Sequence, residues 1–232
     1  MTSGWTAQIP RLFSTTTTTT TTTTKNTDET TAPPTAAEIQ IDNYLNAAWE
    51  ANLNSNFEAS AIAFRKAMVK QTQELGSQAE ATLLSKNNLG AALLNNGCLD
   101  EAELILRECL LERIQVLGDD SAATLTTANN LGILLKQMGQ LEEAEAMSKR
   151  AFVGSLTAMG PAHEDVLDTA QNYGEILVMV GKIEQCERLF SQMQNQCERN
   201  FGVSHPNTQK FIQNAAILKE MKEQKEREEA EK

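Results

Sequence analysis

The sequence predicts an all-α fold, a solenoid of antiparallel helix hairpins that follows a disordered N-terminal extension. The stretch NNLGAALLNNGCLDEAE, which begins at Asn87, returns 42 residues later as NNLGILLKQMGQLEEAE, which begins at Asn129, with 10 of 17 letters unchanged. Within one copy the apolar residues recur every three or four positions, the period of an α-helix face, and no alternating run indicates a strand. A fixed period of this length is typical of stacked repeats, in which each unit buries its apolar face against its neighbours.

The 42-residue spacing holds without a gap across most of the chain. One column of equivalent positions contains Asn46, Asn88, Asn130, Asn172 and Asn214. A second contains only small residues, Ala48, Gly90, Gly132, Gly174 and Ala216. A third contains Ser55, Gly97, Gly139 and Gly181, and a fourth contains Gly76, Gly118, Gly160 and Gly202. Agreement in so many columns makes chance a poor explanation, so the repeat is expected to be structural.

The third and fourth columns predict where the helices of each unit end. A residue just past a helix terminus often needs a positive φ, which glycine adopts without steric cost. Gly97 therefore closes a first helix and Gly118 a second one. Because a single residue separates Gly97 from Leu99, the two helices turn back and lie antiparallel. The predicted units cover residues 37–76, 79–118, 121–160 and 163–202, followed by a closing helix over 205–220, and the whole array spans 35–220.

The glycines of the second column sit inside the predicted first helices, where each costs about 1 kcal/mol relative to alanine. Another column of small residues lies twelve positions downstream, in the second helices: Ser60, Ala102, Ala144 and Cys186. Small residues facing each other let two helix axes approach closely. We therefore interpret the two columns as the packing seam of each hairpin.

The two ends of the array have the features of caps. Thr35 and Glu38 form the pattern of a capping box, in which a hydroxyl and a carboxylate satisfy the first free amides of a helix. At the other end, an apolar face is expected to cover the last hairpin, made of Phe211, Ile212, Ala215 and Ala216. Residues 221–232 are mostly charged, and the spacing of Glu223 and Arg227 favours a solvated helical tail.

The N-terminal residues 1–34 are predicted to be a disordered extension. They include ten consecutive threonines, Thr15 to Thr24, and cannot bury a core. No acidic residue precedes Asp28, and RLFS, which begins at Arg11, resembles a processing site, as expected of a mitochondrial transit peptide. A cytoplasmic tail is the alternative, because only Arg11 and Lys25 supply positive charge.

Composition argues against several kinds of function. A net charge of −11 opposes binding to nucleic acid or anionic lipid, and no apolar run is long enough for insertion into a membrane. The four cysteines are spaced so that neither close pair can bridge within a helix. His163 and His205 lie too far from any cysteine for a zinc signature and occupy equivalent linker positions, so we expect them to pack or to cap helices. No catalytic residue, metal or cofactor is predicted.

The repeated phrase resembles a known family. NNLG, a following leucine and G-x-L-x-E-A-E resemble the tetratricopeptide repeat, in the 42-residue variety of kinesin light chains. GPAHEDV, from Gly160, and GVSHPNT, from Gly202, are similar to the linkers of that variety. The resemblance covers residues 37 to 220, with departures at Ser55 and Gln185. It implies a right-handed superhelix whose groove binds an extended peptide.

The resemblance also implies a binding site. In tetratricopeptide proteins the asparagine two residues before the glycine typically enters the groove and bonds the ligand backbone, which here selects Asn46, Asn88, Asn130, Asn172 and Asn214. Asn95, Gln137 and Met179 are expected one or two turns further on, with Leu84, Thr127 and Asp168 on the preceding turn. Alternatively, these amides bond a neighbouring helix.

The predicted function is therefore that of a non-enzymatic scaffold or adaptor whose partner is a protein or a peptide. A helical-repeat nucleic-acid-binding protein and a regulatory subunit of an enzyme complex are the alternatives. Scarcity of lysine and arginine on the inferred wall disfavours a clamp for chaperone carboxylates, which needs cationic donors. The identity of the partner and the oligomeric state leave no signature in the sequence.

Overall fold

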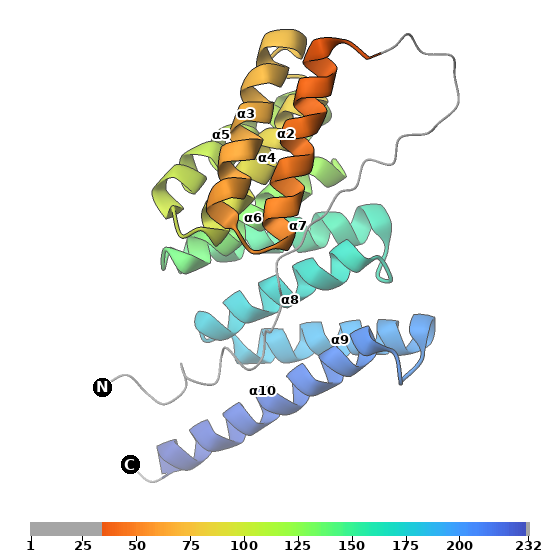
Figure 1. Cartoon of the computed structure of the whole chain (residues 1–232). Coiled ribbons are helices and arrows are strands. Elements are labelled where there is room, and N and C mark those ends of the chain that lie inside the picture. The colour runs from red at the N-terminus through yellow and green to blue at the C-terminus, as the bar shows by residue number, and fades with distance from the viewer. Residues whose placement is uncertain (1–33, 231–232) are drawn as a thin grey trace. The chain divides into compact units, whose positions relative to one another are not determined.

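The computed structural model describes residues 34–230, so the predicted extension, apart from Pro34, and the last two residues lie outside the described part of the chain. The described residues form nine α-helices and no strand, which confirms the all-α prediction (Figure 1). The helices are α2 (Ala36–Leu53), α3 (Phe57–Leu75), α4 (Glu80–Asn95), α5 (Leu99–Leu117), α6 (Ala122–Gln137), α7 (Leu141–Met159), α8 (Glu164–Met179), α9 (Ile183–Phe201) and α10 (Pro206–Ala230).

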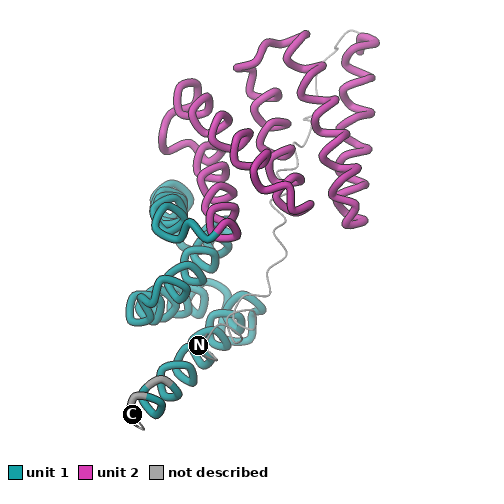
Figure 2. Tube along the Cα trace, turned by 90° about the vertical axis from the view of Figure 1, so that its left-hand side faces the viewer, with its two compact units in different colours: residues 1–17, 139–232 teal, residues 18–138 magenta. Residues whose placement is uncertain are grey.

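The helices fall into two compact units, shown in magenta and teal in Figure 2. The N-terminal unit ends at Met138 and contains α2 to α6; the C-terminal unit begins at Gly139 and contains α7 to α10. Within each unit, helices that follow one another in the chain pack together, and α4 also contacts α6. We call α2, α4, α6, α8 and α10 the first helices and α3, α5, α7 and α9 the second helices.

The second helices end at the glycines of the fourth column, as predicted. Gly118, for example, caps α5 with φ 87° and ψ 167°, a conformation that is essentially restricted to glycine. Its carbonyl oxygen accepts a hydrogen bond from the Thr124 hydroxyl at 2.8 Å, which ties the turn to the next helix. In the third column, Ser55 replaces glycine and still adopts a φ of 56°. The first turn of the array therefore keeps the left-handed geometry without its preferred residue.

The start of the array follows the predicted capping box. The Thr35 hydroxyl accepts from the backbone N–H of Glu38 at 3.2 Å, and the Glu38 carboxylate accepts from the backbone N–H of Thr35 at 2.7 Å. Two amides at the beginning of α2 are thus satisfied reciprocally.

The predicted seam is present in the hairpins that lie within one unit. The Ser60 hydroxyl donates to the carbonyl oxygen of Ala48 at 3.0 Å, and the Cys186 thiol donates to that of Gly174 at 3.3 Å. These bonds require the backbone of the first helix to lie close to the second. A Cβ atom placed on Gly174 would lie 2.4 Å from the ring of Phe190. The glycine therefore makes room chiefly for a large residue one turn beyond the small column.

The closing helix α10 continues without a break through the predicted charged tail. Its Phe211 is fully buried and packs against Phe190, with ring centroids 5.6 Å apart. The prediction for Ala216 was wrong, because this residue is exposed. The small column faces the second helix of its own hairpin, and no described helix follows α10. Lys219 stands on α10 at the position that is leucine in α4, α6 and α8, so this position is charged only in α10 among these four helices.

Candidate peptide-binding face

The structure places the predicted asparagine column on the first helices. In the N-terminal unit, Asn46 is exposed on α2, whereas Asn88 on α4 and Asn130 on α6 are 8% and 3% exposed. In the C-terminal unit, Asn172 on α8 and Asn214 on α10 are buried. The position is thus equivalent in all five helices, but access to solvent is greatest on α2.

A chain of side-chain amides joins two first helices of the N-terminal unit. The Asn130 amide nitrogen Nδ2 donates to Oδ1 of Asn87 at 3.2 Å, and Asn87 Nδ2 donates to Oδ1 of Asn88 at 3.4 Å. All three side chains are buried. The alternative role given in the sequence analysis, a bond to a neighbouring helix, is therefore present at Asn130. This bond holds α6 in register with α4.

The two ends of this chain keep hydrogen-bonding capacity. Within residues 34–230, the NH₂ group of Asn88 donates to no partner, and the carbonyl oxygen of Asn130 accepts from none. One end therefore offers a donor and the other an acceptor, which are the two groups that a peptide unit needs. Asn87, which links them, was not predicted as a site residue. The doublet NN, repeated at Asn87 and Asn129, was the available signal.

The neighbouring predicted positions differ in their outcome. Asn95 is half-buried at the end of α4, and Gln137 is exposed at the end of α6. The expectation that Thr127 faces the surface was wrong. Its side chain is fully buried, and its hydroxyl accepts from the Arg113 guanidinium at 2.8 Å. Thr127 lies one residue beyond the position that is equivalent to Leu84 in the 42-residue spacing, and this rotates its side chain into the core.

Two cationic side chains fix α4, α5 and α6 relative to one another. Lys86 on α4 contacts Glu112 and Glu108 on α5 at 2.9 and 3.1 Å. Burial lowers the pKa of Lys86, but the hydrogen bonds with these two carboxylates outweigh it and raise the pKa above its usual value. Arg113 on α5 is 2% exposed and donates to the carbonyl oxygens of Leu83 on α4 and of Ala123 on α6. These contacts fix the positions of α4 and α6, the two helices that carry the amide chain.

The two histidines act as the sequence predicted. His163 is the N-cap of α8, and its Nδ1 accepts from the backbone N–H of Asp165 at 3.2 Å. His205 makes the same bond to the N–H of Asn207 and stacks on Phe201, with ring centroids 4.6 Å apart. Both imidazoles therefore accept a hydrogen bond from a backbone N–H at the start of a helix. Among the described residues, no group of three or more His, Cys, Asp and Glu could hold a metal ion.

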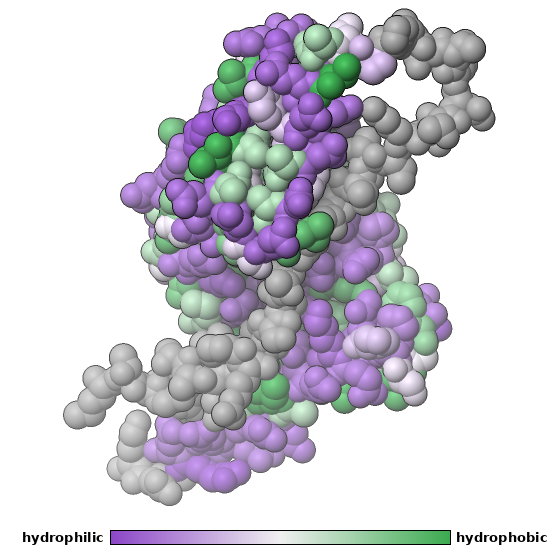
Figure 3. All heavy atoms as spheres, in the orientation of Figure 1, coloured by the Kyte–Doolittle hydropathy of each residue, from purple (hydrophilic) through white to green (hydrophobic). Residues whose placement is uncertain are grey.

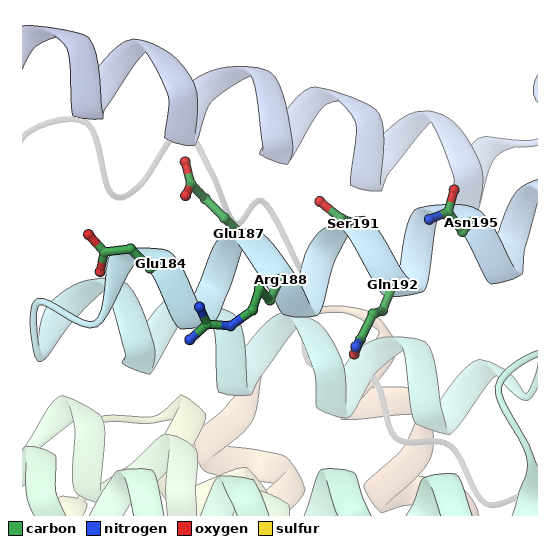
Figure 4. A pocket seen from close by; sticks show the side chains of 6 residues that line it. All are labelled: Glu184, Glu187, Arg188, Ser191, Gln192 and Asn195. Atoms are coloured by element: carbon green, nitrogen blue, oxygen red, sulfur yellow. The ribbon is translucent and has the colours of Figure 1, made fainter.

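A hollow of about 410 Å³ lies in the C-terminal unit, away from the predicted positions (Figure 4). Its described lining comes entirely from α9: Glu184, Glu187, Arg188, Ser191, Gln192 and Asn195. Glu187 also contacts Lys222 of α10 at 3.4 Å. The lining side chains are mixed in charge and belong to one helix surface, so the described residues bring no catalytic groups together in this hollow.

No described helix combines the length and the apolar character needed to cross a membrane.

Comparison with known proteins agrees with the helical-repeat fold. Residues 78–152 match the family described as tetratricopeptide repeat. Among solved structures, the chain is similar to two crystal structures of a protein of the kinesin light chain kind with nearly identical TPR-like repeats from Podosopora anserina. One of these is a form with a single substitution, and the TM-scores are 0.73 and 0.72 at 16% identity, over 81% of this chain and 89% of those chains.

A third similar structure is BtubC (BKLC) from P. vanneervenii, with a TM-score of 0.65 at 17% identity, over 85% of this chain and 88% of that one. At these identities the likeness concerns the fold. None of the curated proteins matches the chain.

Proposed function

Because the chain is a tetratricopeptide repeat protein, we propose that it is a non-enzymatic interaction scaffold whose first helices hold an extended segment of a protein partner. Tetratricopeptide repeats typically mediate protein interactions. The proposed face of the N-terminal unit comprises Asn46, Asn88, Asn130, Asn95 and Gln137. In the C-terminal unit, Asn172 and Asn214 occupy the equivalent helix positions.

The amide chain from Asn130 through Asn87 to Asn88 carries this proposal. It leaves one donor and one acceptor on neighbouring helices, and a peptide group placed there satisfies both without its side chain being read. The buried contacts of Lys86 and Arg113 keep these amides in place, so little conformational entropy is lost on binding. Side-chain selectivity would then come from the surrounding positions, such as the half-buried Leu84.

Proximity labelling in the native cell tests the proposal and can also identify the partner. The labelling enzyme is fused to the full chain, either wild type or carrying Asn88→Ala together with Asn130→Ala. We expect the double variant to lose the main labelled partners. The two substitutions remove the Asn88 donor and the Asn130 acceptor, which are the groups proposed to bond the peptide backbone. The matched control is Gln192→Ala with Asn195→Ala, which removes two exposed amides from α9.

The comparison requires folded variants, so circular dichroism and thermal melting are measured on each purified protein. Equal labelling by the wild type and a folded double variant would place the binding site elsewhere. Loss of partners from the α9 control as well would show that the effect is not specific to the amide chain.

A further inference from the structure

Each of the two second helices of the N-terminal unit, α3 and α5, exposes two aliphatic side chains on one helix face. Ile62 and Val69 on α3 are 50% and 48% exposed, and Leu104 and Leu111 on α5 are 68% and 61% exposed. Residues seven apart are separated by about two helical turns, so each pair shares a helix face. Hydrophobic side chains also reach the surface of this unit among hydrophilic ones in the view of Figure 3. We call each pair, with the residue between, an aliphatic stripe.

The two stripes lie in register on neighbouring helices. Ile62 and Leu104 are equivalent in the 42-residue repeat, and so are Val69 and Leu111. Arg65 on α3 and Glu101 on α5 form an ion pair at 2.7 Å, which shows that the two helices are in reach of each other. The stripes therefore occupy equivalent places on two second helices whose side chains reach each other at this ion pair. Soluble monomers rarely expose large contiguous apolar patches without a binding role.

The charges within the stripes are opposite. Lys66 lies between Ile62 and Val69, and Glu108 occupies the equivalent position between Leu104 and Leu111. Both are exposed, although Lys66 also lies over the ring of Tyr44 and Glu108 also contacts Lys86. One stripe thus reads aliphatic, cation, aliphatic, and the other reads aliphatic, anion, aliphatic.

We propose that this surface binds a second copy of the chain in a two-fold arrangement, with α3 of each copy against α5 of the other. The two-fold axis would lie in the interface, midway between α3 and α5 and parallel to both helices. It would place the α3 stripe of one copy opposite the α5 stripe of its partner. Aliphatic side chains then meet aliphatic ones, and Lys66 meets Glu108 of the partner subunit twice. Such self-complementarity is what an isologous interface requires.

The size of the surface indicates a reversible dimer. Each stripe spans about 12 Å of helix and is about 10 Å wide, so the two stripes together cover roughly 240 Å² of each copy. Stable interfaces bury about 800 Å² per partner. Association is therefore expected to depend on concentration. It uses the second helices, so it is independent of the proposed peptide-binding face on the first helices.

The equivalent positions on α9 carry polar side chains in place of the aliphatic ones. On α9, the positions equivalent to the stripe are Arg188, Gln192 and Asn195. This helix face is polar and cannot bury apolar area against a copy of itself. The residue that corresponds to Lys66 and Glu108 is Gln192, which supplies a matched position for a control substitution.

Sedimentation velocity of the full chain, from about 1 μM to about 1 mM, tests the proposal. We expect the apparent mass to rise from 25.5 kDa toward twice that value. Lys66→Glu alone and Glu108→Lys alone should each remain monomeric, because two like-charged pairs then face each other. An equimolar mixture of the two variants should dimerise again, because both pairs are attractive in the mixed dimer. Gln192→Glu should behave as the wild type.

A monomeric wild type at every concentration would overturn the proposal, as would a mixture of folded variants that stays monomeric. Circular dichroism verifies folding, since a lysine at position 108 would lie near Lys86. Should that variant unfold, Leu104→Ser with Leu111→Ser provides the second test, because both side chains are more than 60% exposed. A dimer that persists in this pair of substitutions would also overturn the proposal.

Discussion

At the scale of single residues, the glycines inside the first helices set how closely the two helices of a hairpin approach. Gly174 is the sharpest case, because an added Cβ would lie 2.4 Å from the buried ring of Phe190. We expect Gly174→Ala to lower the free energy of unfolding by about 1–3 kcal/mol, as overpacking does, although alanine favours helix. Urea denaturation followed by circular dichroism measures the change.

The control for this substitution is Ser191→Ala, because Ser191 is exposed on α9 and packs in no seam. It should stay within about 0.5 kcal/mol of the wild type. An unobstructed helical site would instead gain about 1 kcal/mol on replacing glycine with alanine. A Gly174→Ala protein as stable as the wild type or more stable would show that the ring moves away without cost.

The four cysteines should differ sharply in reactivity. Cys98 is exposed, whereas Cys109, Cys186 and Cys197 are buried. Burial, and to a lesser extent the nearby Glu187 carboxylate, raises the pKa of Cys186 to about 12, so its reactive thiolate is scarce near neutral pH. Titration of the native protein with a chromogenic disulfide reagent should therefore give one fast thiol, and four after unfolding. Cys98→Ser should remove the fast phase, and fast reaction of more than one thiol would contradict the buried assignment.

Residue patterns predicted most helix ends but not all contacts. Gly118 and His163 were identified because turn and cap geometry depends on local chemistry, which a single residue type reveals. The bond between Asn130 and Asn87 joins residues 43 positions apart, and no local rule specifies which of two adjacent asparagines turns inward. Thr127 was misplaced because one residue rotates a helical side chain by about 100°.

At the scale of elements, α10 stabilises the end of the C-terminal unit by covering α9. Phe211 is fully buried against Phe190. Phe211→Ala should lower the free energy of unfolding by about 3–5 kcal/mol, because it removes an aromatic side chain and leaves a cavity. Thermal and urea unfolding measure the effect. Val203→Ala, at a side chain that is 57% exposed, is the control and should be nearly neutral. A small loss in the Phe211 variant would show that α10 does not anchor the unit.

The sequence predicted the existence and type of the helices because their apolar period repeats with the 42-residue spacing. The predicted apolar face of α10 was only partly right. Phe211 is buried, but Leu218 and Met221 complete the face in place of Ala216. Similarity to earlier units suggested Ala216, whereas burial depends on which helix is actually adjacent. A repeat column does not show which helix packs against each of its members.

At the scale of the whole molecule, the composition of residues 1–34 leads to a prediction about where the protein is located. We propose import into mitochondria, on the basis of the hydroxyl-rich composition and the absence of acidic residues before Asp28. A fusion of residues 1–40 to a fluorescent protein is expected to co-localise with a mitochondrial marker. The Arg11→Glu substitution in the same fusion should reduce import, because it removes positive charge from the leader. A diffuse cytoplasmic signal from the unchanged fusion would exclude the proposal.

The division into two compact units between Met138 and Gly139 was not predicted. The columns run through this point without interruption, and Gly139 belongs to the same column as Gly97 and Gly181. Because the sequence pattern describes each helix and its immediate neighbours, it cannot indicate where one compact unit ends and the next begins.

Packing within each unit joins helices that are neighbours, or next neighbours, in the order of synthesis. Contacts of such short sequence separation require little loop closure, so they form quickly and do not depend on distant segments. A nascent chain can therefore acquire native structure one hairpin at a time as it leaves the ribosome. A stalled or prematurely terminated chain would retain ordered helices up to its last complete hairpin, with only the final apolar face uncovered.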